Sequence, residues 1–218
     1  MYLSMKNILL NKVVPDVFAR RSDVLSDIWF NNVEFHKRCK YLIEANSGTG
    51  KSSLGSFLFG YRNDYVGDIA FDNINISTFS LNDWNILRRK HLAFLWQELR
   101  LFPELTALEN VEIKNRLTDF QKKETILRWF EMLGISDKID TPIAKMSYGQ
   151  QQRVAMVRTL CQPFDFVFVD EPISHLDESN SGIMAQILVD EVERQNAGLI
   201  VTSIGKRMPI TYDKILRL

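Results

Sequence analysis

Cysteine is scarce in this chain, which has only two among its 218 residues, Cys39 and Cys161. They lack the spacing of metal ligands, and the N-terminal stretch, a short apolar run interrupted by asparagine and lysine, does not resemble a signal peptide. A zinc module and a disulfide-stapled secreted domain are therefore excluded, and we expect two free thiols in a reducing compartment.

Long apolar runs and an excess of either charge are also missing. No segment approaches the roughly 18 apolar residues that a membrane-spanning helix needs, so we expect a cytoplasmic chain that reaches a membrane only through another protein. The 27 basic and 27 acidic residues balance, whereas a nucleic-acid-binding protein usually shows a basic excess. We therefore expect no nucleic acid as a partner.

Apolar residues are plentiful enough for a core, since 45% of the chain is hydrophobic, which suffices for one domain. β-Branched and aromatic runs predict strands at 8–14, 41–44, 69–71, 91–96, 166–169 and 199–202. Helical patterns at 52–59, 147–160 and 178–194 lie between several of them. This alternation predicts an α/β fold with a largely parallel sheet.

The segment from about residue 99 to 146 differs, because its apolar residues recur at helical spacing without a strand run. They include Leu105, Leu108, Val111, Ile126, Trp129, Phe130 and Leu133. We therefore predict a core formed by residues 1–97 and 147–218, with a helical subdomain, residues 98–146, inserted into it.

The sequence ANSGTGKS, residues 45–52, follows a predicted strand and precedes a predicted helix. Glycines let backbone N–H groups turn inward around phosphates, lysine adds a mobile positive charge, and a hydroxyl ligates Mg²⁺. Gly48, Gly50, Lys51 and Ser52 supply these parts, and the helix N-terminus attracts anions further. An ordinary Gly-rich turn is the alternative. Ala45 replaces the first glycine of the usual pattern, which is costly only if its φ must be positive.

A second candidate site is the pair Asp170-Glu171, which ends the buried apolar run 164–169. Carboxylates at the C-terminal end of a parallel strand suit a ligand crevice. The first can lie near Mg²⁺, and the second can reach a water aligned with the γ-phosphate. Alone, the pair could be an exposed acidic turn. Downstream of a phosphate-binding loop, it predicts a metal and water site.

The segment that ends in this carboxylate pair, KMSYGQQQRVAMVRTLCQPFDFVFVDEP, resembles the signature helix and Walker B strand of the ATP-binding cassette (ABC) ATPases. Three more segments resemble this family: VGDIAFDNINIS after the phosphate-binding helix, FLWQELRLFPELTALENV around the Q-loop glutamine, and ISHLDE at the D-loop. The resemblance covers nearly the whole chain. LFPELTALENV is most similar to the lipoprotein-release, macrolide-exporter and cell-division ATPases.

The resemblance implies a P-loop NTPase (RecA-like) core with a mostly parallel sheet, an antiparallel β subdomain and the inserted helical subdomain. It also implies a head-to-tail dimer, formed with itself or with a second ABC ATPase. ATP and Mg²⁺ would lie between the P-loop of one subunit and the SYGQ segment of the other. Hydrolysis would drive a separate membrane permease, which would hold the chain on the inner face of the cell membrane.

The same resemblance assigns site residues. It implies catalytic roles for Glu171, Gln97 and Ser203, and Mg²⁺ contacts from Ser52, Gln97 and Asp170. The nucleotide would be bound by Phe18, Asn46, Ser47, Gly48, Thr49, Gly50, Lys51, Ser52, Ser53, Ser147, Gly149, Gln150 and Asp177. Phe18 is the candidate for stacking on adenine, and a core phenylalanine is the alternative.

Two further departures from the family pattern bear on activity. Tyr148 replaces the first glycine of S-G-G-Q, where its ring crowds the nucleotide, stacks at the rim of the interface or points away. Ser203 stands where the family has a histidine on the γ-phosphate, and a hydroxyl lacks the reach and positive charge of imidazole. His175 in the D-loop either compensates or is a packing residue. We predict ATP binding and dimer closure with slow or partner-dependent hydrolysis.

Two other functions stay open. One is a regulatory or structural ATP-binding clamp on a membrane partner, without solute transport. The other is a soluble ABC ATPase that acts on DNA or ribosomes. Relatives of the second kind carry coiled-coil arms, zinc modules or two cassettes, and this sequence has one cassette and a short insertion.

Overall fold

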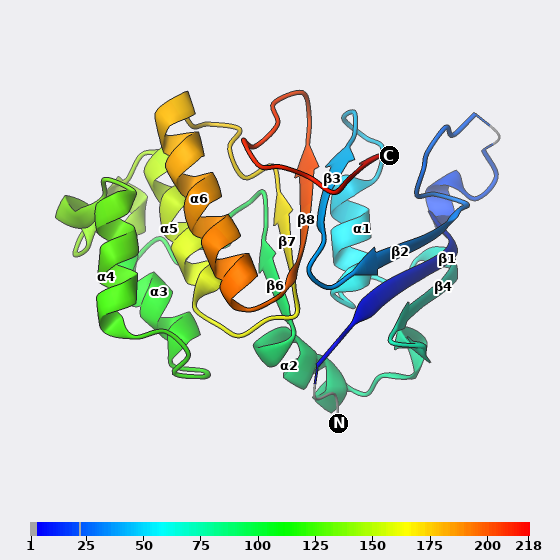
Figure 1. The fold of residues 1–218 in the computed structure, drawn as a ribbon, viewed down its shortest axis with the longest axis horizontal. Helices are drawn as coiled ribbons and strands as arrows, with labels where there is room; N and C mark the ends of the chain where they lie inside the picture. The colour runs from blue at the N-terminus through cyan, green and yellow to red at the C-terminus, as the bar shows by residue number, and fades with distance from the viewer. Residues whose placement is uncertain (1–3, 22) are drawn as a thin grey trace.

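The computed structural model describes residues 4–21 and 23–218. The first three residues of the predicted core, and Ser22, lie outside the described residues. In this part of the chain a parallel sheet and an antiparallel sheet lie side by side, with helix α1 (Lys51–Leu58) between them (Figure 1).

The central sheet is parallel throughout, with strand order β6-β7-β8-β3-β9. Its strands are β3 (Lys40–Glu44), β6 (Leu92–Leu95), β7 (Phe166–Asp170), β8 (Gly198–Ser203) and β9 (Lys214–Arg217). Apolar side chains alternate between its two faces: Phe166 and Phe168 belong to one core cluster, Val167 and Val169 to the other. Because the strands are parallel, the carboxyl ends of β3, β7 and β8 meet at one edge.

The second sheet is antiparallel, in the order β2-β1-β4-β5. Its strands are β1 (Asn7–Pro15), β2 (Asn32–His36), β4 (Tyr65–Phe71) and β5 (Ile74–Asn75), and α2 (Leu81–Lys90) follows them. The sequence patterns did not find β2, β5, β9 or α2. These elements are short or bury few side chains; α2 buries only Trp84 and Leu87. The capping box between Ser80 and Asp83 marks its start.

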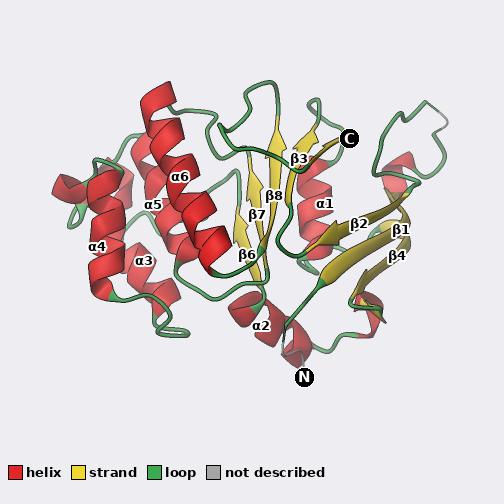
Figure 2. Cartoon of the chain, in the orientation of Figure 1, coloured by secondary structure: helices red, strands yellow, loops and turns green. Residues whose placement is uncertain are grey.

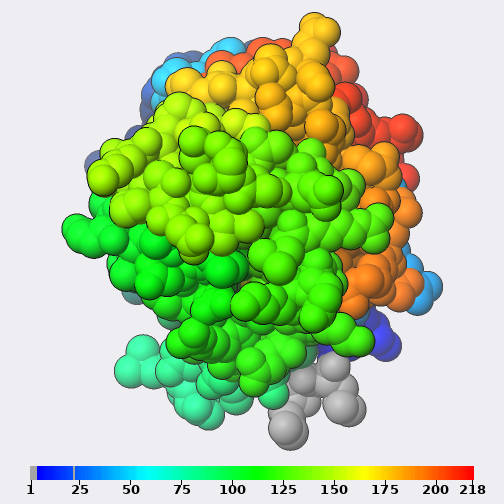
Figure 3. Space-filling model, turned by 90° about the vertical axis from the view of Figure 1, so that its left-hand side faces the viewer, coloured from blue at the N-terminus to red at the C-terminus, as the bar shows by residue number. Residues whose placement is uncertain are grey.

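The opposite face of the parallel sheet is covered by helices α5 (Tyr148–Leu160) and α6 (Glu178–Arg194), with α3 (Ala107–Asn115) and α4 (Lys123–Met132) beyond them (Figure 2). Seen from that side, the chain between β6 and α5 covers most of the surface (Figure 3). Thr106 and Pro142 form a β-bridge near the two ends of this segment. Its Val111 and Phe130 share one core with Val154 of α5. The limits 98–146 remain our prediction for the subdomain.

The predicted α/β architecture is confirmed, with a parallel sheet, an antiparallel sheet and an inserted pair of helices. None of the described helices has the length and apolar character needed to cross a membrane.

Candidate nucleotide-binding site

The loop between β3 and α1 has the backbone of a phosphate-binding turn. Gly48 has φ +80° and Gly50 has φ +98°, both in the left-handed region that favours glycine. A Cβ on Gly50 would also lie 3.1 Å from the Trp29 ring. Ala45 is not among the described residues with positive φ. Its methyl group therefore causes no backbone strain, and the relaxed first position of the motif is tolerated.

The first turn of α1 is open to an anion. Its N-cap is Gly50, and no side chain caps the helix. By contrast, Ser147 caps α5 and Asp177 caps α6. The first N–H groups of a helix have no partner within the helix, so those of α1 can bind phosphate oxygens. Lys51 adds a positive charge there and is only 7% exposed.

A carboxylate and a hydroxyl meet at the edge of the sheet. Asp170 ends β7, and its Oδ2 accepts a hydrogen bond from Ser52 Oγ at 3.3 Å, while Oδ1 accepts one from Thr202 Oγ1. Burial raises the pKa of the Asp170 carboxyl, and the hydrogen bond from Thr202 opposes this; the charge of Glu171 raises it further. These hard oxygen atoms suit Mg²⁺, which binds through few carboxylates and the phosphates of its substrate.

Glu171 is held in an unusual backbone conformation, with φ +48°. Its N–H donates to Thr202 O at 3.2 Å, and its carbonyl accepts from Gln152 Nε2 at 3.2 Å. Its Oε1 lies 3.2 Å from Lys51 Nζ, an ion pair, but accepts no hydrogen bond from the described residues. This oxygen can therefore orient a water once Lys51 turns to phosphate.

A cavity of about 510 Å³ joins these groups. Of the predicted site residues it brings together Phe18, Ser47, Gly48, Gly50, Lys51, Ser52, Ser53, Gln97 and Glu171. A neighbouring cavity of about 370 Å³ is lined by Asn46 and Thr49, with Phe18 again on its wall. The P-loop, the Q-loop glutamine and the second carboxylate thus share one space.

Phe18 lies where the two cavities adjoin. Its ring packs against the apolar core that contains Trp29, and the Arg21 guanidinium lies 5.5 Å from its centroid. Trp29 Nε1 donates to Thr49 O at 2.9 Å and so holds the P-loop from this side. Adenine stacking on Phe18 stays a prediction, supported by its place beside the P-loop.

The signature and D-loop residues lie outside the lining of both cavities. Ser147 Oγ accepts from Gln150 N at 3.3 Å, and the Gln150 side chain accepts from Ser147 N at 2.9 Å, a capping box. Asp177 accepts from Asn180 N at 2.8 Å. Gly149 follows in the first turn of α5. Within one chain, these groups therefore lie apart from the P-loop and its two cavities.

Ser203 is buried at the end of β8, and its hydroxyl donates to Lys206 O within its own loop. Its carbonyl accepts from Ala45 N at 3.1 Å. His175, the other polar candidate here, packs its ring on Tyr148 with centroids 4.5 Å apart, and its Nδ1 lies 2.9 Å from Ser174 Oγ. These contacts favour the packing alternative for His175.

Three residues around the site were not found from the sequence: Thr202, Trp29 and Gln152. Thr202 reaches Asp170 because β7 and β8 pair in a register that sets the two side by side. Trp29 donates a hydrogen bond to the carbonyl of Thr49, and Gln152 donates one to the carbonyl of Glu171. Both donors come from segments distant in the sequence. The run of three glutamines at 150–152 is visible in the sequence, but the sequence does not show that the third one turns its side chain toward Glu171.

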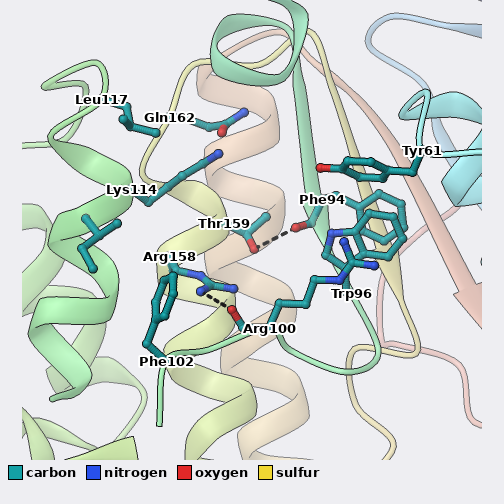
Figure 4. Close-up of a pocket in the computed structure, with 11 residues that line it drawn as sticks. Tyr61, Phe94, Trp96, Arg100, Phe102, Lys114, Leu117, Arg158, Thr159 and Gln162 are labelled. Carbon is teal, nitrogen blue, oxygen red and sulfur yellow. Dashed lines mark hydrogen bonds between the residues drawn. The ribbon is translucent and has the colours of Figure 1, made fainter. Parts of the chain in front are cut away.

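A separate cleft of about 230 Å³ lies between α3, α5 and the chain after β6 (Figure 4). Four of its lining residues are exposed large apolar side chains: Tyr61, Phe102, Ile113 and Leu117. The Arg100 guanidinium stacks 3.7 Å from the centroid of the Trp96 ring. Apolar side chains gathered at an exposed cleft indicate a binding surface.

The charges of this cleft are all positive, and no carboxylate lines it. Burial lowers the pKa of Lys114 to about 8, with further lowering by Arg158 and Arg89. Burial also lowers the pKa of Arg158 to about 10. Among the described residues the Lys114 ammonium has no hydrogen bond or ion pair, and the buried Gln162 Oε1 has no donor. The cleft therefore holds uncompensated polar groups.

Comparison with known proteins places the chain among named relatives. The family model described as ABC transporter matches residues 31–174. An uncharacterised ABC transporter ATP-binding protein from Methanocaldococcus jannaschii is 31% identical over 180 residues, which cover 81% of this chain and 80% of that protein. The lipoprotein-releasing system ATP-binding protein LolD from Francisella tularensis is 30% identical over 199 residues, covering 89% and 85%.

Solved structures share the fold. A dimeric ATP-binding cassette, MJ0796, in a post-hydrolysis state bound to ADP and Pi superposes with a TM-score of 0.74 at 23% identity, covering 90% of this chain and 87% of that one. A bacterial Atm1-family ABC exporter with ATP bound gives 0.79 at 20% identity, covering 100% of this chain and 38% of that one. The predicted P-loop NTPase fold is confirmed.

Proposed function

The chain belongs to the ABC transporter family of ATP-binding proteins, and on that premise we propose that it hydrolyses ATP as one half of a head-to-tail dimer and drives a separate membrane permease. The observation that carries this proposal is the convergence of Lys51, Ser52, Asp170 and Glu171 at one edge of the parallel sheet.

Each group has a role in phosphoryl transfer to water. The open first turn of α1 and the Lys51 ammonium bind the phosphates, while Ser52 and Asp170 would hold Mg²⁺, with Gln97 at the wall of the same cavity. When bound, Mg²⁺ would neutralise negative charge on the phosphates. Glu171 orients the attacking water when Lys51 has left it for phosphate.

A second subunit completes the site. Ser147 and the first N–H groups of α5 stand at a helix N-terminus that can donate to a γ-phosphate across an interface. The partner is a second copy of this chain or another ABC ATPase. Asp177 and the D-loop would approach the same interface.

The permease binds in the cleft between the inserted helices and the core, where it would hold the chain at the inner face of the membrane. Its docking segment would cover the exposed apolar side chains, such as Phe102 and Ile113, and bring a carboxylate to Lys114 and Arg158. Such a carboxylate would compensate buried cations that have no acidic partner within the cleft. Because the cleft borders both the core and α3, closure of the dimer would move the bound segment.

Replacing Lys114 with methionine is expected to raise the melting temperature at pH 7. The pKa of Lys114 is about 8 folded, against 10.5 for the free side chain. Below pH 8 both states carry the charge, so the cost of burying it, at most about 3 kcal/mol, is fully present. As the pH rises from 8 to 10.5 the folded protein alone loses the proton, and the cost fades.

The measurement is thermal unfolding at several pH values, where roughly 2–4 °C corresponds to each kcal/mol. The advantage of Lys114→Met should shrink between pH 8 and 10.5. Lys123→Met, on the exposed side of α4, is the matched control and should show no such dependence. A Lys114→Met difference that stays constant with pH would contradict an uncompensated cation in the cleft.

Turnover of the purified chain is expected to be measurable but slow, and Ser203→His is expected to raise it several-fold. An imidazole adds the reach and charge that the serine hydroxyl, engaged with Lys206 O, does not offer. The measurement is steady-state ADP release, beside Ser203→Ala, which removes the loop hydrogen bond without adding a donor and should not raise turnover. No change or a fall in Ser203→His would show that Ser203 is not the limiting defect.

A clamp that binds ATP without cycling is the second candidate. The engagement of the Ser203 hydroxyl within its own loop favours it. The same assay separates the two functions: tight ATP binding without ADP release, in the parent and in Ser203→His, would support the clamp. Absence of ATP binding would contradict both.

A further inference from the structure

One side chain spans the loops that follow β6 and β7. Tyr148 is the first residue of α5, and its hydroxyl donates to Gln97 O at 2.7 Å, 51 residues away in the sequence. Its ring packs edge-on against His175, with an interplanar angle of 64°. Tyr148 as a residue is 40% exposed, so its ring is fixed by these two contacts rather than by burial.

We propose that Tyr148 is a positioning residue that couples a subunit's own nucleotide site to the surface it offers to its partner. This inference rests on the proposed function. Gln97 lines the cavity that contains Lys51 and Glu171, whereas Ser147, next to Tyr148, lies outside it and would face the other subunit in the proposed dimer. A shift of Gln97 on nucleotide binding is therefore transmitted to the start of α5.

Helix α5 holds the loop after Gln97 at a second place. Arg158 donates to Leu99 O at 2.6 Å and to Arg100 O at 2.7 Å. Leu99 and Arg100 have φ of +58° and +51°, two consecutive non-glycine residues in the left-handed region. Such a strained loop persists only when its surroundings fix it. Helix α5 thus holds this loop at two places, through Tyr148 in its first turn and through Arg158 near its end, so the loop and the helix move together.

The start of α5 also packs closely against the D-loop. A Cβ on Gly149 would lie 3.2 Å from His175 O and 3.3 Å from Leu176 Cδ2, so the first turn of α5 lies directly on the D-loop backbone. A glycine in place of Tyr148 would supply neither the hydrogen bond to Gln97 nor the ring contact with His175.

Tyr148→Phe tests the link by deleting one oxygen. We expect a roughly two- to tenfold fall in the maximal rate of ATP hydrolysis, the effect of one hydrogen bond, and a fall of the Hill coefficient for ATP toward 1. The ATP affinity of the monomer should stay unchanged, since Tyr148 does not line its cavity. Tyr41→Phe is the control: it also removes a hydrogen-bonded hydroxyl, which accepts from His36 N, at the far end of β3.

Hydrogen exchange gives a readout that does not need turnover. In the parent, addition of the nonhydrolysable analogue AMP-PNP should slow exchange at residues 147–151 as well as at the P-loop. In Tyr148→Phe the P-loop should still respond, and residues 147–151 should not. Equal responses of parent and Tyr148→Phe at 147–151, with equal rates and Hill coefficients, would overturn the inference. A parent that binds no nucleotide at all would instead overturn the proposed function.

Discussion

Glu171→Gln is expected to lower ATP turnover at least a hundredfold while ATP remains bound. The Glu171 carboxylate lines the cavity and is placed to orient or deprotonate a water, and a general base contributes about 10²- to 10⁴-fold to a rate. An amide keeps the shape of the side chain but is not a base. The measurement is ADP release at saturating ATP, together with the dissociation constant of ATP.

The structure adds a second expectation for the same variant. Because Glu171 Oε1 pairs with Lys51 Nζ in the nucleotide-free chain, the amide releases Lys51, and ATP should bind as tightly as in the parent or more tightly. Glu104→Gln, an exposed loop carboxylate, is the matched control. A fall in turnover of only a fewfold, or an equal fall in the control, would contradict a catalytic role for Glu171.

Lys51→Ala is expected to weaken ATP binding on the order of a hundredfold, and turnover should disappear with it. The ammonium is buried beside the P-loop, and hydrogen bonds to charged groups contribute roughly 1.5–3 kcal/mol each. The measurement is calorimetric titration with ATP and Mg²⁺. Binding within about threefold of the parent would contradict a phosphate-binding role for this lysine.

Loss of Lys51 also leaves Glu171, of which 11% of the side chain is exposed, without its ion-pair partner. Breaking a partly buried pair destabilises a protein, so a fall in ATP binding could reflect unfolding. The double variant Lys51→Ala/Glu171→Gln removes both charges and should recover the melting temperature of the parent. It should not recover ATP binding, because the phosphate ligand is still missing.

Local sequence determined much of this protein. Alternation of apolar runs with helical patterns predicted the α/β fold, and the range 178–194 for α6 coincides with the helix. The order of P-loop, signature and carboxylate pair identified the family before any contact was known. These features are local because backbone preference, side-chain periodicity and helix capping act within a few residues.

Tertiary structure alone decided how the motifs meet. The register of β7 with β8 placed the Thr202 hydroxyl beside Asp170, and packing of α5 on the chain after β6 turned the Tyr148 hydroxyl toward Gln97. The uncompensated charge of Lys114 likewise depends on which distant side chains enclose it. The sequence determined which chemical groups exist and in what order; pairing and packing of distant segments decided which of them touch, because no local preference specifies a long-range contact.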